Sequence, residues 1–122
     1  VAVAQAMGHA DAFLCGDFNE PDGLGNEAAV ALLGGLADAW TSVHGEDAPG
    51  ATFDTQRNRL AALNAGPRSH ARRIDRVFAP PCWRAEAASL LGERDASSDH
   101  FGLAATFALQ SARLAQPVHT SS

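Results

Sequence analysis

Residues 73–109, RIDRVFAPPCWRAEAASLLGERDASSDHFGLAATFAL, carry the sequence pattern that indicates the fold class most clearly. Its first six residues alternate polar and apolar side chains, which is typical of a half-buried strand, and Pro80 and Pro81 end that strand. Residues 83–91 predict a second strand, although their alanine and glutamate content also suits a helix. After a polar loop, residues 102–109 have the clearest strand pattern in the chain. This part of the chain therefore predicts a sheet.

The residues upstream predict one more strand and two helical segments. Residues 12–15 are a short apolar run, typical of a buried strand, and the turn formers of 16–23 follow it. Residues 1–7 predict the end of a helix, and Asn26 can cap a second helix over residues 26–33.

The remaining segments are predicted to carry little regular structure. Residues 36–40 continue the apolar pattern as a short segment, and residues 41–72 are mostly loop-like, with a turn at Pro49 and Gly50. A loop of this length in a compact domain is usually functional or disordered. Residues 111–122 predict a frayed tail.

Composition bounds the size of the protein and its partners. The chain has 122 residues, 46% of them apolar, which predicts one small globular domain. Its nine basic residues are all arginine, and 14 carboxylates give a formal net charge of -5. This charge argues against nucleic-acid binding through a broad basic face. If the chain handles a polyanion, positive charge must come from locally placed arginines, a metal ion or residues outside this sequence.

Cysteine usage points to a reducing compartment, and the start of the chain points to a longer protein. Cys15 and Cys82 are too few for a disulfide scaffold and lack the paired spacing of a zinc site, so we expect a cytoplasmic protein. The sequence has neither a signal-peptide pattern nor the run of about 20 apolar residues that crosses a bilayer. Because it starts without methionine inside a helical pattern, we expect a fragment of a longer protein.

Three polar clusters lie at the ends of the predicted strands or within them. They are residues 16–19 after the first strand, 73–76 within the middle one and 97–100 before the last. Because the ends of adjacent strands converge, such a sheet presents aspartates, an asparagine and a histidine together. These side chains offer oxygen ligands for a hard cation and a titratable imidazole. The combination suits metal-assisted attack on a phosphorus ester.

Each cluster taken alone has a simpler interpretation. Asp17 and Asn19 are equally well explained by an Asx-turn. Asp75 alone is better explained by pairing with Arg73 or Arg76 on a solvated face. The third cluster can be a turn or cap followed by a structural histidine. Only their joint occurrence, each at a strand edge, favours a shared site.

The same clusters carry a family resemblance. FLCGDFN (13–19), RIDRVF (73–78) and SDHFGL (98–103) resemble the last three signature motifs of the endonuclease/exonuclease/phosphatase superfamily. The resemblance implies an α/β (α+β) fold, namely the C-terminal half of a four-layer α/β/β/α sandwich with mainly antiparallel strands. Residues 1–110 would form this half-domain, with the N-terminal half absent, and residues 111–122 a flexible tail.

A further stretch resembles one branch of that superfamily. TFDTQRN (52–58) is similar to the Thr-Trp-Asp-Thr-Gln-x-Asn stretch of the tyrosyl-DNA phosphodiesterase 2 branch. SLLG (89–92) precedes the final motif in a similar way. The resemblance therefore implies a nucleic-acid end as the substrate.

The resemblance also implies a role for each matched side chain. Asp17 would handle the proton of the attacking water or the departing oxygen, and Asn19 would hydrogen-bond the phosphate or the nucleophile. His100 would donate a hydrogen bond to a nonbridging phosphate oxygen, with Asp75 holding its imidazole protonated and oriented. Asp99 would orient the nucleophilic water or approach the metal. We therefore predict that Asp75 and His100 are hydrogen-bonded neighbours, with Asp17, Asn19 and Asp99 in the same cavity.

The implied cofactor is Mg²⁺, with Mn²⁺ as an alternative, held by Asp17, Asn19 and Asp99. In the family, an N-terminal half provides an asparagine and the glutamate that is the principal magnesium ligand, and nothing in this sequence corresponds to them. Phe53 and Arg57 are the expected substrate-binding residues. Phe53 stands where the branch has tryptophan, and we expect it to stack on a base.

The leading hypothesis is a magnesium-dependent phosphodiesterase of the nuclease type, a DNA repair hydrolase that acts on a 5'-phosphotyrosyl DNA or an RNA end. One alternative is a sphingomyelinase-like phosphodiesterase of phospholipid head groups. Another is an inactive fragment that needs its N-terminal half as a partner. Replacing Arg57 or Arg59 should weaken oligonucleotide cleavage under the first hypothesis and leave micellar lipid hydrolysis as the main activity under the second.

Overall fold

The computed structural model describes residues 11–19, 34–66 and 68–110. Within them the chain has an α+β fold with antiparallel sheets and few helices, so the predicted fold class is confirmed. The strands are β1 (Leu14–Asp17), β2 (Ala37–Asp38), β3 (Asp75–Ala79), β4 (Trp83–Leu91) and β5 (Gly102–Leu109), and the helices are α3 (Ala39–His44) and α4 (Arg59–Ala65).

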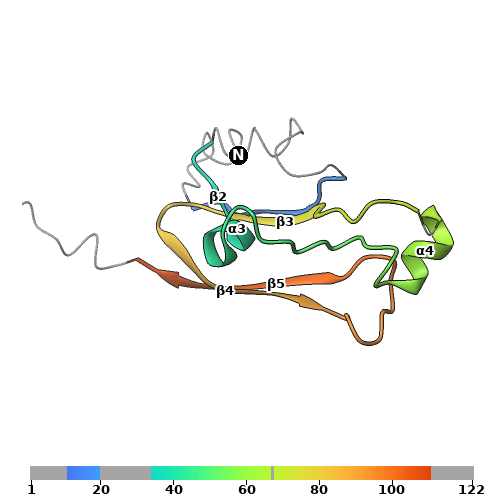
Figure 1. The fold of residues 1–122 in the computed structure, drawn as a ribbon. Coiled ribbons are helices and arrows are strands. Elements are labelled where there is room, and N and C mark those ends of the chain that lie inside the picture. Colours follow the sequence, from blue (N-terminus) through green and yellow to red (C-terminus); the bar gives the residue numbers. More distant parts are fainter. Residues whose placement is uncertain (1–10, 20–33, 67, 111–122) are drawn as a thin grey trace, which may run out of the picture.

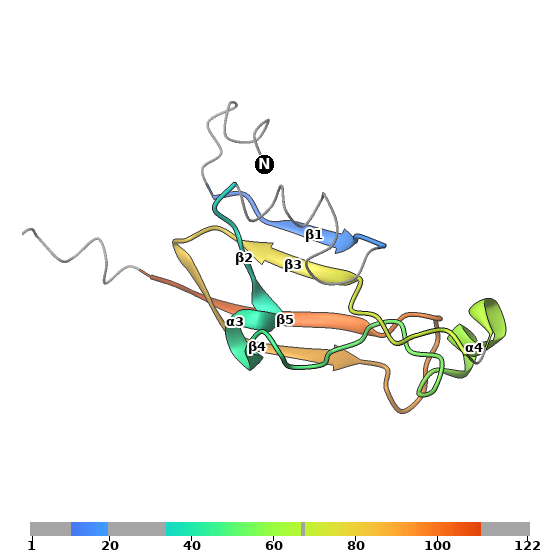
Figure 2. The same ribbon diagram turned by 45° about the horizontal axis from the view of Figure 1, so that its top comes forward.

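The first sheet has the strand order β1-β3-β2, and β3 pairs antiparallel with both neighbours. Figure 2 shows β1 and β3 side by side, and the strand order places β2 on the other side of β3. The register places Leu14 opposite Phe78, and Asp17 opposite Asp75. Phe78 is fully buried and packs with Leu36 in the core of this sheet. A single apolar cluster therefore fixes the register that brings the two aspartates together.

The second sheet is the hairpin of β4 and β5, paired from Trp83 with Leu109 to Leu91 with Gly102. An irregularity between Ala85 and Ala87 shifts the register once. Figure 1 shows this hairpin as a layer separate from the layer of β1 and β3. Helix α3 contacts both layers, through β3 and β4. The start of β5 lies at the same end of the molecule as α4 and the start of β3 (Figure 1).

The predicted strands are present, with changes at their ends. The first begins two residues later than predicted and continues through Asp17, so the aspartate belongs to the strand and not to the turn. The middle strand begins at Asp75 and not at residue 73. Residues 83–91 are a strand and not a helix, and 102–109 is a strand as predicted.

The described residues of 41–72 are mostly irregular, as predicted, but α3 overlaps the start of this stretch and α4 lies within it. Asp38 caps α3, because its side chain accepts a hydrogen bond from the Trp40 N–H. Asn58 caps α4 in the same way, accepting from the N–H groups of Leu60 and Ala61. These caps satisfy backbone donors that a helix leaves without a partner at its first turn. Both helices are short, so periodicity alone gave little signal.

Three predicted segments, at residues 1–7, 26–33 and 111–122, lie outside the described residues. Within the ranges that the structure describes, no helix has the length and apolar character needed to span a bilayer.

An ion pair joins the first sheet to the start of α3. The guanidinium of Arg73 donates to both carboxylate oxygens of Asp38, at 2.7 and 3.1 Å, and both side chains are almost fully buried. Arg76 is also buried and donates to the carbonyl of Arg73. These two arginines therefore serve the fold and do not form a solvated face.

Candidate active site

The candidate site forms where β1 ends and β3 begins. Asp17 is the last residue of β1 and Asp75 the first of β3, and the antiparallel register places them directly opposite each other. Two like charges in this arrangement repel across the strands. A group that carries or donates positive charge between them would relieve this repulsion.

His100, just before β5, lies between these two carboxylates. Its Nδ1 is 2.7 Å from Oδ2 of Asp75, and its Nε2 is 3.9 Å from Oδ2 of Asp17. The predicted hydrogen bond between Asp75 and His100 is present. Because an ionised carboxylate only accepts hydrogen bonds, Nδ1 is the donor in this bond. The bond fixes the ring so that Nε2 points to the Asp17 side.

The site is partly open to solvent. The side chain of Asp17 is 47% exposed, whereas those of His100 and Asp75 are 26% and 20% exposed. Asp75 and His100 also line a cavity of about 470 Å³, together with the loop between β4 and β5. Asp17, Asn19 and Asp99, which we expected in the same cavity as Asp75 and His100, are not among the residues that line it.

Asn19 is joined to the site through the backbone. Its N–H donates to Oδ1 of Asp17 at 2.7 Å, and its φ of 53° lies in the left-handed region that asparagine tolerates. This is the Asx-turn that the sequence also allowed. The turn and a catalytic role of Asp17 are compatible, because Oδ2 of Asp17 is the oxygen that faces His100.

Asp99 points toward α4. Its Oδ2 accepts from Nδ2 of Asn64 at 2.9 Å, and its Oδ1 from the Ser98 hydroxyl at 3.3 Å. The hydrogen bond from Asn64 lowers the pKa of the Asp99 carboxyl below its ordinary value. Among the described residues, the cluster that could hold a metal consists of Asp17, Asp75 and His100, without Asp99.

The two expected substrate-binding residues have different environments. Phe53 is only 5% exposed, packs in a core cluster with Ile74, and its ring contacts His100 edge-on at 5.6 Å. Arg72 lies over one face of the Phe53 ring, 4.9 Å from its centroid, and the burial of the ring leaves little of it open to stack on a base. Arg57 is half exposed, pairs with Glu93 and remains at the surface.

Three polar residues near the site were given no role of their own in the sequence interpretation. Thr52 hydrogen-bonds the backbone beside Asp75 and His100, Asn58 donates to the carbonyl of Ser98, and Asn64 donates to Asp99. An asparagine directly before the run RLAALNA is a helix-cap signal that could have located α4, and α4 carries Asn64.

The donor set of the cluster fits a divalent cation. The ligand atoms of Asp17, Asp75 and His100 lie within 4.8 Å of one another, and the carboxylates supply the oxygens that Mg²⁺ and Mn²⁺ prefer. One oxygen of Asp75 is already bonded to His100. A cation here would therefore rely chiefly on Asp17 and on water.

Comparison with known proteins gives a family. The model of the endonuclease/exonuclease/phosphatase family matches residues 1–100. A search of curated proteins found no significant match. The family match spans well over half of the 122 residues and includes the three residues of the cluster. The chain therefore belongs to the endonuclease/exonuclease/phosphatase family, whose members are phosphoester hydrolases that typically use divalent metals.

Proposed function

We propose that this chain carries catalytic residues of a magnesium-dependent phosphodiesterase that acts on a nucleic-acid end, in the manner of the tyrosyl-DNA phosphodiesterase 2 branch. The observation that carries the proposal is the meeting of Asp17, Asp75 and His100, which come from three separate segments; Asp75 and His100 are hydrogen-bonded, and Asp17 lies 3.9 Å from the ring. The family membership limits the chemistry to phosphoester hydrolysis.

Each side chain of the cluster has a separate task. Asp75 holds the His100 ring through Nδ1, which leaves Nε2 to donate to a nonbridging phosphate oxygen when it is protonated. Asp17 lies on that side of the ring and accepts the proton of the attacking water. Asn19 stands beside it to hydrogen-bond the phosphate. A bound divalent cation would neutralise negative charge on the phosphoryl oxygens.

Asp99 and Arg57 are proposed to act from the rim. Asp99 is next to His100 and would orient water, with Asn64 keeping it ionised. Arg57 would contact the substrate backbone, since it stays half exposed beside the loop between β4 and β5. In this chain the C-terminal half of the domain would comprise residues 1–110, and an N-terminal half would supply the glutamate that the metal requires.

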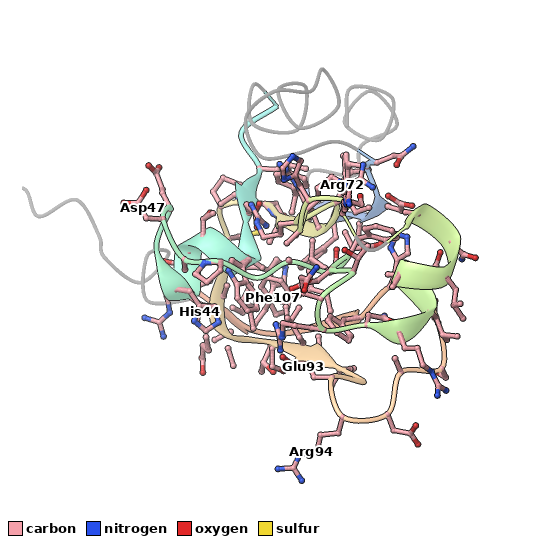
Figure 3. All side chains as sticks on the ribbon, turned by 45° about the vertical axis from the view of Figure 1, so that its right-hand side comes forward. His44, Asp47, Arg72, Glu93, Arg94 and Phe107 are labelled. Carbon is pink, nitrogen blue, oxygen red and sulfur yellow. The ribbon has the colours of Figure 1, made fainter. Side chains whose placement is uncertain are left out.

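Local arginines support a polyanionic substrate. A second cavity, of about 260 Å³, is lined by Arg57, Arg59 and Arg94 together with acidic residues of the adjoining loop. Ala96 lines both this cavity and the one at His100, so the two adjoin. Figure 3 shows the Arg94 side chain extending away from the body of the molecule at that loop. A nucleic-acid strand with one phosphate at His100 would place another near these arginines.

The test is a hydrolysis assay with three substrates: a 5'-phosphotyrosyl oligonucleotide, an oligonucleotide with a plain end, and sphingomyelin micelles. The chain is assayed with Mg²⁺ and with Mn²⁺, alone and mixed with an N-terminal half from a family member. We expect metal-dependent release of tyrosine, lost in Asp17→Asn and His100→Ala.

Charge at the rim provides the matched control. Arg59→Ala should weaken oligonucleotide cleavage, whereas Arg84→Ala, an exposed arginine in β4 away from both cavities, should not. Preferential hydrolysis of sphingomyelin would overturn the proposed nucleic-acid substrate and indicate a lipid substrate instead. Failure to cleave any of the three substrates, even with the added half, would refute the proposal.

A further inference from the structure

We infer that Thr52 is a positioning residue that sets the geometry of Asp75 and His100. The expected effect of Thr52 on catalysis rests on the proposed function, whereas the hydrogen bonds that Thr52 makes do not. Thr52 lies in the extended segment that runs between the two sheets, and no part of its surface is exposed. It contacts the main chain next to both members of the pair.

The hydroxyl of Thr52 holds the start of β3. Its Oγ1 accepts hydrogen bonds from the N–H groups of Ile74, at 3.3 Å, and Asp75, at 3.1 Å. A hydroxyl oxygen has two acceptor positions, and this pair of donors uses both. The bonds fix the backbone from which the Asp75 carboxylate extends.

The carbonyl of Thr52 holds the residue after His100. It accepts from the N–H of Phe101 at 2.7 Å, and Phe101 is itself 2% exposed. The following residue, Phe53, pairs with Arg72 through two backbone hydrogen bonds of 3.0 and 2.8 Å and places its ring against His100. The segment that contains Thr52 and Phe53 is therefore hydrogen-bonded to the chain next to Asp75 and to the chain next to His100.

This link matters because Asp75 and His100 belong to different layers. Asp75 starts β3 in the first sheet, and His100 precedes β5 in the hairpin. The 2.7 Å bond between them depends on the spacing of the two layers at this end. A shift of about 1 Å would break a hydrogen bond of this length and is enough to slow catalysis about a hundredfold. Thr52 links the two layers, because it accepts hydrogen bonds from the N–H of Asp75 in one layer and from the N–H of Phe101 in the other.

Thr52→Val removes the hydroxyl at nearly constant volume, and Thr52→Ser restores it. Thr55→Val is the matched control, because Thr55 is a buried threonine of the same segment whose hydroxyl donates to the carbonyl of Ser69. The primary readout is the tautomer of the neutral His100 ring, measured from its long-range ¹H–¹⁵N correlations, which requires no activity. Steady-state kinetics with the phosphotyrosyl oligonucleotide is the second readout.

We expect Thr52→Val to lose the Nδ1–H form of His100 and to lower kcat about tenfold to a hundredfold with little change in KM. Thr52→Ser and Thr55→Val should keep the wild-type tautomer. If Thr52→Val keeps the wild-type tautomer, as Thr55→Val does, the inference is overturned. An inactive wild type with the expected tautomer changes would refute the proposed function and leave the role of Thr52 in place.

If Thr52→Val does not fold, amide hydrogen exchange in the wild-type chain tests whether Thr52 holds the backbone at Asp75 and Phe101. The hydrogen bonds to Thr52 predict that the Asp75 and Phe101 amides exchange as slowly as the interior of β3. Exchange at the rate of an exposed loop would contradict the inference.

Discussion

Two groups of charged residues surround the start of β3, and their environments differ. Arg73 and Asp38 form an ion pair with side chains only 7% and 6% exposed, whereas Asp17 and His100 in the candidate site are 47% and 26% exposed. The first group is hydrogen-bonded within the protein and holds α3 against the sheet. The second keeps polar atoms available for a ligand. Arg73 and Asp75 are only two positions apart, yet Arg73 belongs to a buried structural ion pair and Asp75 to the more exposed candidate site.

The sharpest way to test this division is His100→Ala. We expect hydrolysis of the phosphotyrosyl oligonucleotide to fall about 10²- to 10⁴-fold, because the substitution removes the imidazole that we propose to donate to the phosphate. His44→Ala is the control, since His44 hydrogen-bonds to the carbonyl of Ala88 and packs against Trp40, away from the cluster. An equal loss of rate in both variants, measured at saturating substrate, would contradict the division.

Asp38→Ala should break the structural pair. It leaves the Arg73 guanidinium buried without its carboxylate and removes the cap of α3, so we expect the free energy of unfolding to fall by about 3–5 kcal/mol. Urea denaturation followed by circular dichroism measures the change. Asp47→Ala, at an exposed position after α3, should change it by less than about 0.5 kcal/mol. A small loss of unfolding free energy in Asp38→Ala would show that the ion pair of Asp38 and Arg73 does not hold α3 against the sheet.

Gly50→Ala should affect the same structural region less severely. Gly50 has a φ of 144°, and a Cβ there would lie 2.3 Å from Cε2 of Trp40, the buried side chain of α3. We expect a loss of about 3 kcal/mol, from backbone strain and overpacking together. Gly92 has a φ of 84° but open space where a methyl group would be added, so Gly92→Ala should cost only about 1 kcal/mol. Equal thermal stability of the two variants would contradict the close approach to Trp40.

The smallest predicted effect concerns Asn64→Ala. Without the hydrogen bond from Asn64, the pKa of Asp99 should rise toward its ordinary value of 3.8, as measured by carboxyl ¹³C shifts during titration. Because the pKa of Asp99 is lowered in the folded state, this bond stabilises the fold above the ordinary pKa. The contribution is lost as the pH falls through the lowered value. Asn64→Ala should therefore be less stable than wild type at neutral pH, with the difference disappearing in acid. An unchanged titration of Asp99 would refute the contact.

Local patterns in the sequence located the longer strands but not the two-residue strand β2. The alternation before Pro80 located β3, and residues 83–91 and 102–109 located β4 and β5. The motifs also predicted the hydrogen bond between Asp75 and His100. Helices α3 and α4 were missed although Asp38 and Asn58 are readable caps, because each helix is too short for an apolar period to stand out.

Long-range partners account for what the sequence did not reveal. The burial of Arg73 depends on Asp38, and the orientation of Asp99 depends on Asn64, each 35 positions away. We expected Phe53 to stack on a base, but it packs in a core cluster with Ile74. Hydropathy and spacing do not encode such pairings, which follow from how the two layers meet.

The pairing of Asp75 with His100 is tested most directly by finding which nitrogen of the neutral His100 ring carries the proton, in the wild-type chain and in Asp75→Ala. We expect Nδ1 in the wild type, because Nδ1 lies 2.7 Å from Oδ2 of Asp75, and we expect Asp75→Ala to remove this preference. A neutral ring protonated on Nε2, with the same spectrum in Asp75→Ala, would show that the two residues are not paired and would contradict the proposed site.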